Sequence, residues 1–109
     1  LFRPKNRRNL QEVVKQVKAQ ALITSKQGVI AALEGMKIRV DREVLLHFGP
    51  YPILFVAAKN DPVFTFEVLE EQLTGSSVTP CITENGHMSH IEDNKEFLEG
   101  LKKFLKNIN

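Results

Sequence analysis

The chain has 109 residues, enough for one small domain with a hydrophobic core. Its hydrophobic fraction of 42% and charged fraction of 26% are ordinary for a globular protein. A net charge of +2 is too small to indicate nucleic acid as a partner, and no apolar run is long enough to cross a membrane. The single cysteine, Cys81, excludes an internal disulfide and fits a reducing compartment, so we expect a cytoplasmic protein.

The first 48 residues carry only helical patterns. Apolar residues recur at the i, i+3, i+4, i+7 spacing of one helix face between residues 10 and 21. A capping box that begins at Thr24 predicts a second helix, with Gly35 at its end. A short third helix is expected to start at Asp41 as its N-cap. The residues that this third helix should bury are Val44, Leu45 and Phe48.

From Pro50 onward the chain reads as strand, helix, strand and helix. The unbroken apolar run at residues 53–58 predicts a strand buried on both faces, as in parallel sheets. A helix with apolar positions from Phe66 to Leu73 follows and ends near Gly75. Residues 78–83 predict a second strand, at a sheet edge because of Pro80. The last helix, capped by Asp93 or Asn94, has one apolar stripe: Phe97, Leu98, Leu101, Phe104, Leu105 and Ile108.

Two parallel strands alone make a marginal sheet, because the first needs neighbours at both edges and layers on both faces. No other segment of the sequence predicts a strand. The chain also begins with Leu1 rather than methionine. We therefore expect this chain to be the closing part of a larger sheet protein, with more of the protein upstream.

Two candidate catalytic residues follow the two predicted strands. Asp61 follows the first strand in a turn, and His87 follows the second strand after Gly86, which permits a sharp turn. Each residue alone is most often a loop residue. Parallel neighbouring strands would bring both to one rim, where a carboxylate can orient the imidazole of a general base. An unperturbed histidine titrates near pH ~6.5 and can exchange a proton at neutral pH.

No nucleophile motif accompanies this pair. The four serines lack the Gly-x-Ser-x-Gly elbow, and Cys81 lies inside a predicted strand, where a buried core thiol is expected. His90 completes a His-x-x-His spacing with His87, but no third ligand lies nearby, so we predict neither a metal site nor a cofactor.

The segment Pro52–Asp61, the run Gly86–Glu92 and the last helix together resemble the closing section of the α/β-hydrolase family. Residues 32–42 also resemble the stretch that leads out of the helical cap in esterase-like members. Lys59 stands where the family has a glycine two residues before the acid. The resemblance implies an α/β fold made of a helical cap remnant, residues 1–48, and the C-terminal βαβα part of the core, residues 49–109.

The resemblance also implies a function. Asp61 would be the triad acid and His87 the base for hydrolysis of an ester or acyl compound by a serine upstream of this chain. The 109 residues alone are expected to be inactive, and the missing core or a second copy of the chain would complete the sheet. Two alternatives stay open: a non-catalytic α/β interaction module that completes its sheet with another chain, and a pseudoenzyme fragment of the same fold.

Overall fold

The computed structural model describes residues 1–108, and the contacts among them form two units. One unit is residues 7–41. The other combines residues 1–6 with the chain from residue 42 onward. The second unit therefore joins the first residues of the chain to residues as far as 89 positions away, and it holds both strands and both candidate residues.

The unit of residues 7–41 consists of helices α1 (Gln11–Ile23) and α2 (Lys26–Ile38), and neither contains a buried residue. The cap of α2 is Ser25 rather than Thr24: the Ser25 hydroxyl accepts from the Gly28 amide at 3.0 Å. Thr24 instead donates to the carbonyl of Gln20. The prediction that Gly35 ends this helix is wrong, because Gly35 keeps a negative φ and the helix runs three residues further.

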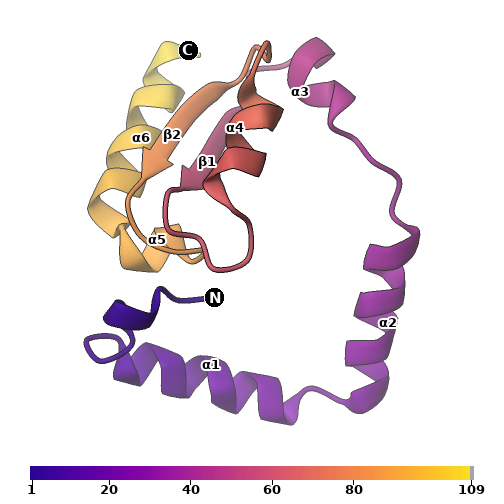
Figure 1. The fold of residues 1–109 in the computed structure, drawn as a ribbon, viewed down its shortest axis with the longest axis vertical. Helices are drawn as coiled ribbons and strands as arrows, with labels where there is room; N and C mark the ends of the chain where they lie inside the picture. The colour runs from indigo at the N-terminus through magenta and orange to yellow at the C-terminus, as the bar shows by residue number, and fades with distance from the viewer. Residues whose placement is uncertain (109) are drawn as a thin grey trace. The chain divides into compact units, whose positions relative to one another are not determined.

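The other unit is a two-stranded parallel sheet with helices around it (Figure 1). Strand β1 (Leu54–Ala58) pairs with β2 (Thr79–Thr83) in parallel, from Leu54 opposite Thr79 to Ala58 opposite Thr83. This confirms the strand–helix–strand–helix prediction and establishes an α/β architecture. The helical elements of the unit are η1 (Pro4–Asn6), α3 (Val44–Phe48), α4 (Phe66–Leu73), α5 (Ser89–Glu92) and α6 (Asn94–Asn107).

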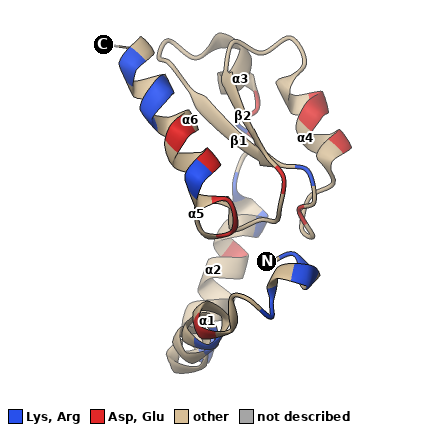
Figure 2. Ribbon diagram, turned by 90° about the vertical axis from the view of Figure 1, so that its left-hand side faces the viewer, with Lys and Arg blue, Asp and Glu red and all other residues tan. Residues whose placement is uncertain are grey.

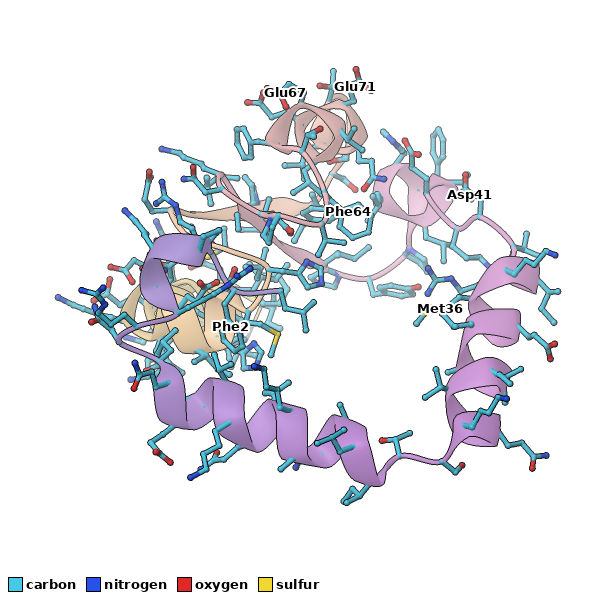
Figure 3. All side chains as sticks on the ribbon, turned by 60° about the horizontal axis from the view of Figure 1, so that its bottom comes forward. Phe2, Met36, Asp41, Phe64, Glu67 and Glu71 are labelled. Carbon is cyan, nitrogen blue, oxygen red and sulfur yellow. The ribbon has the colours of Figure 1, made fainter. Side chains whose placement is uncertain are left out.

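Helices α4 and α6 cover opposite faces of this sheet (Figures 1 and 2). Cys81 of β2 packs against Gly100 of α6, where a Cβ would lie 2.5 Å from its sulfur. Pro80 and Ile82 instead share a groove with Phe66 of α4. Successive strand residues point to opposite faces, so these contacts assign one helix to each face. The acidic side chains of Glu67 and Glu71 point outward from α4 (Figure 3).

The core of this unit is small. Among the hydrophobic residues described, only Phe2, Ala57 and Ala58 are buried. The prediction that α3 buries its apolar residues is wrong, since Phe48 is 83% exposed and Val44 is exposed as well. An apolar face stays exposed when its own unit places no layer over it. No helix in residues 1–108 is both long and apolar enough to cross a bilayer.

Candidate active site

Asp61 and His87 meet at the carboxyl end of the sheet. Asp61 lies three residues beyond the end of β1, and His87 lies four beyond the end of β2. Because the strands are parallel, both loops leave the same end. The imidazole Nδ1 lies 2.8 Å from the Oδ2 of Asp61, a short, charge-assisted hydrogen bond. The structure thus brings together the two residues that the sequence singled out.

The other carboxylate oxygen of Asp61, Oδ1, holds the side chain in place. Oδ1 accepts the backbone N–H of Val63 at 2.7 Å and that of Phe64 at 3.2 Å. The Asp61 side chain is only 6% exposed. Burial by itself raises the pKa of this carboxyl, but the hydrogen bonds from His87, Val63 and Phe64 outweigh burial and hold the pKa below its ordinary value of 3.8. Asp61 is therefore ionised at neutral pH.

The ionised carboxylate determines the tautomer of His87. A carboxylate only accepts hydrogen bonds, so the imidazole Nδ1 must carry the proton and donate it to Asp61. The neutral ring then presents a lone pair at Nε2, the form required of a general base. The ring of Phe64 lies at a centroid distance of 5.8 Å and a tilt of 45° from the imidazole. The His87 side chain remains 35% exposed, so the ring is partly open to solvent.

The loop that carries His87 is held by polar residues of α5 and the start of α6. The Asp93 carboxylate accepts from the backbone N–H of Asn85 at 2.8 Å and from its side-chain amide at 2.6 Å. The Ser89 hydroxyl donates to the carbonyl of Gly86 at 3.2 Å and accepts from Thr83 at 3.0 Å. Thr83, Ser89 and Asp93 are all buried. These contacts fix the turn that carries His87.

Asn60 joins the two loops directly. Its side-chain amide donates to the carbonyl of Glu84 at 2.6 Å, and its backbone N–H donates to the carbonyl of Asn85 at 3.1 Å. From the sequence, Asn60 is predicted only to lie in a turn. Asp93 is predicted to cap the last helix. Asp93 does occupy the N-cap position of α6 but makes no side-chain cap bond, because its carboxylate is engaged by Asn85.

A pocket of about 330 Å³ adjoins the pair. Its wall is mainly apolar, and its polar lining residues are Asp61, Gln72, His87 and Ser89. The lining residues are Phe55, Val56, Ala58, Asp61, Phe64, Val68, Leu69, Gln72, His87 and Ser89. Phe55 and Val56 are successive strand residues that point to opposite faces, so the pocket wraps around the edge of β1 that is not paired with β2.

The serine hydroxyls and the cysteine thiol described in this unit are not set up as nucleophiles for His87. Ser76 donates to the carbonyl of Leu73, and Ser77 donates to that of Leu46. Ser89 lines the pocket, but its proton goes to Gly86. Cys81 lies in the middle of β2, and burial raises the pKa of its thiol.

Among residues 1–108, no three histidine, cysteine or acidic side chains gather as a metal site would require. Neither a protein-family model nor a curated protein matches this chain. The arrangement itself is a buried, ionised carboxylate that orients an accessible imidazole at the rim of an apolar pocket.

Proposed function

We propose that this chain is the closing part of an α/β-fold hydrolase in which Asp61 and His87 serve a serine nucleophile from outside these 109 residues. The observation that carries the proposal is the 2.8 Å contact between Asp61 Oδ2 and His87 Nδ1. The order of acid and base along the chain, and the last helix after the histidine, agree with the resemblance to that family.

In the proposed ester hydrolysis, each residue has a step that its position allows. Nε2 of His87 takes the proton of the serine hydroxyl as its oxygen attacks the ester carbonyl, and Asp61 stabilises the imidazolium that forms. The imidazolium then protonates the departing alcohol, and the carbon–oxygen bond to that alcohol breaks. In the second half, His87 takes a proton from water, whose oxygen attacks the acyl carbon of the acyl-enzyme. The bond from that carbon to the serine oxygen then breaks, His87 returns the proton to the serine oxygen, and the carboxylic acid product leaves. The pocket beside His87 would take an apolar part of the substrate, and the ester or acyl class is what the resemblance implies.

The unpaired edge of β1 supports placing the rest of the sheet in another segment. Thr79 donates to the carbonyl of Ile53, and Lys59 donates to that of Thr83, so the odd-numbered residues of β1 bond to β2. The N–H and C=O groups of Leu54, Val56 and Ala58 therefore face the other edge, where residues 1–108 supply no strand.

This edge also lacks the features that protect natural edge strands. Residues 54–58 contain no charged residue and no proline, and they form no bulge in their pairing with β2. An unbroken apolar strand of this kind is typical of the interior of a sheet. We infer that a further strand of the intact hydrolase pairs with β1.

The coding sequence upstream of Leu1 tests this proposal most directly. We expect it to continue in frame into a strand and a Gly-x-Ser-x-Gly elbow, and a fluorophosphonate probe should then label that serine in the longer protein. Asp61→Asn and His87→Ala should each abolish the labelling. A start codon directly before Leu1 would refute the proposal and favour a non-catalytic interaction module. An upstream elbow without a nucleophile would indicate a pseudoenzyme.

The 109-residue chain supplies a second test. It should hydrolyse p-nitrophenyl acetate no faster than its His87→Ala variant, because the nucleophile is missing. His90→Ala is the matched control for background reaction of an exposed imidazole. A rate that falls with His87→Ala and not with His90→Ala would contradict the missing-nucleophile argument.

A further inference from the structure

Glu92 connects the first residues of the chain to the loop that carries His87. Its Oε1 accepts the backbone N–H of Arg3 at 2.7 Å and the side-chain amide of Asn6 at 3.1 Å. The sequence position at the end of α5 indicates only a favourable charge near a helix start. The structure instead uses this carboxylate to hold a segment 89 residues away along the chain.

The bound segment, residues 1–6, is anchored at several other points. The Phe2 side chain is only 6% exposed, so the segment has a hydrophobic anchor next to Arg3. The guanidinium Nη1 of Arg3 donates to the side-chain oxygen of Asn85 at 3.3 Å. Most importantly, the carbonyl of Leu1 accepts the backbone N–H of His87 at 3.0 Å. The segment therefore contacts the backbone of the candidate base itself.

Gly86 packs closely against Glu92 and Arg3. A Cβ at Gly86 would collide with the Glu92 carboxylate and would lie 2.8 Å from the backbone nitrogen of Arg3. The Glu92 Oε2 on this side is buried and has no hydrogen-bond partner among the described residues. A buried carboxylate oxygen without a partner is costly, so the close packing around Glu92 lowers the stability of the fold at this point.

We propose that Glu92 is a positioning residue for His87. By holding residues 1–6 against Gly86 and the His87 amide, Glu92 fixes the backbone from which the imidazole reaches Asp61. His87 is then held from three sides: through its amide by Leu1, through Gly86 by Glu92, and through its ring by Asp61. The importance of this position for catalysis rests on the proposed function, whereas the coupling between Glu92 and the His87 backbone does not.

Amide hydrogen exchange of the 109-residue chain tests this coupling. In Glu92→Ala, we expect protection of the His87 amide to fall by about tenfold or more, because the bonds that hold residues 1–6 in place are lost. Amides of β1 and β2 should keep their protection. Glu84→Ala is the matched control: it removes the same charge from the loop between β2 and α5, where the Glu84 carboxylate pairs with Lys59 at 3.4 Å.

Two further variants separate positioning from general stability. Phe2→Ala removes the other anchor of the segment and should expose the same amide. The effects of Phe2→Ala and Glu92→Ala should be less than additive when combined, because both release one segment. Glu92→Gln keeps an acceptor oxygen for Arg3 and should retain part of the protection.

The tautomer of the His87 ring provides the readout closest to the proposed role. In wild type, ¹⁵N NMR should find the proton on Nδ1, and Glu92→Ala should show a mixture of both tautomers. Unchanged protection of the His87 amide in Glu92→Ala would overturn the proposal, and so would an equal loss of protection across β1 and β2. The coupling can hold even if no upstream nucleophile exists, so its test is separate from that of the proposed function.

Discussion

The Asp61→Asn substitution replaces the ionised partner of His87 with an amide of the same shape. The amide oxygen can still accept the N–H groups of Val63 and Phe64, so the turn should survive. The new NH₂ group faces Nδ1 as a donor, which forces that nitrogen to act as an acceptor. The ring proton must then move to Nε2. The substitution therefore removes the lone pair that a base needs while leaving the fold in place.

The loss in stability follows from the contacts of the carboxylate. A hydrogen bond to a charged group contributes about 1.5–3 kcal/mol when it is buried. The imidazole is 35% exposed, and water screens this bond, so we expect a loss of about 1 kcal/mol for Asp61→Asn. Asp61→Ala deletes the acceptor of all three hydrogen bonds and should cost about 2–3 kcal/mol.

The sign of the pH dependence is fixed by the depressed pKa of Asp61. Folding favours the ionised carboxylate, so its contribution to stability is complete above the ordinary value of 3.8 and is lost as the pH falls through the lower pKa of the folded state. Wild type should therefore be more stable than Asp61→Asn at about pH 7. The difference should shrink as the pH is lowered from about 7 to about 2, because the wild-type carboxyl takes up a proton as the pH falls through its lowered pKa.

Urea unfolding followed by circular dichroism at both pH values measures the difference in free energy, and ¹⁵N NMR at about pH 8 identifies the tautomer of the neutral ring. Equal free energies of unfolding at about pH 7 would refute the stabilising role of the bond. A difference that does not shrink in acid would refute its assignment to the carboxylate. A proton that stays on Nδ1 in the variant would refute the account of the tautomer.

Three further expectations concern the packing of each unit. Gly100→Ala places a Cβ 2.5 Å from the sulfur of Cys81 and should lower the free energy of unfolding in urea by about 1–3 kcal/mol. Gly35→Ala, with no atom within 4 Å of the new Cβ, is the helical control and should raise helix content in circular dichroism. Burial raises the pKa of Cys81, so its reaction with a thiol reagent at about pH 8 should be roughly tenfold slower in the folded chain than in urea. A folded thiol that reacts as fast as the unfolded one would contradict the contact between α6 and β2.

Local signals in the sequence were sufficient for the order of the strands and the longer helices, but the short helices η1 and α5 were not predicted. The apolar run at residues 53–58 and the spacing from Phe66 to Leu73 depend only on neighbouring residues, and both elements form there. The helix end near Gly75 is also confirmed, since Gly75 adopts the positive φ of 71° that favours glycine. The errors at Thr24 and Gly35 are errors of helix ends, where competing local hydrogen bonds decide between adjacent residues.

The candidate site was predictable only in part. Parallel strands direct consecutive loops to one edge, so the meeting of Asp61 and His87 follows from the order of elements. The order of elements did not predict which groups hold the loop that carries His87. Asp93 and Glu92 look like ordinary helix-start acids in the sequence, yet one binds Asn85 and the other binds Arg3. Their partners depend on how distant segments pack, which local patterns do not encode.

The sequence by itself determined the kinds of secondary structure, their order, and which two side chains stand at the carboxyl end of the sheet, because hydrophobic period and turn chemistry act over a few residues. The tertiary structure decided which apolar faces are covered and what fixes the imidazole. Phe48 shows the first point, since an apolar side chain is buried only where another layer exists. The bond from the His87 amide to Leu1 shows the second, because it joins opposite ends of the chain.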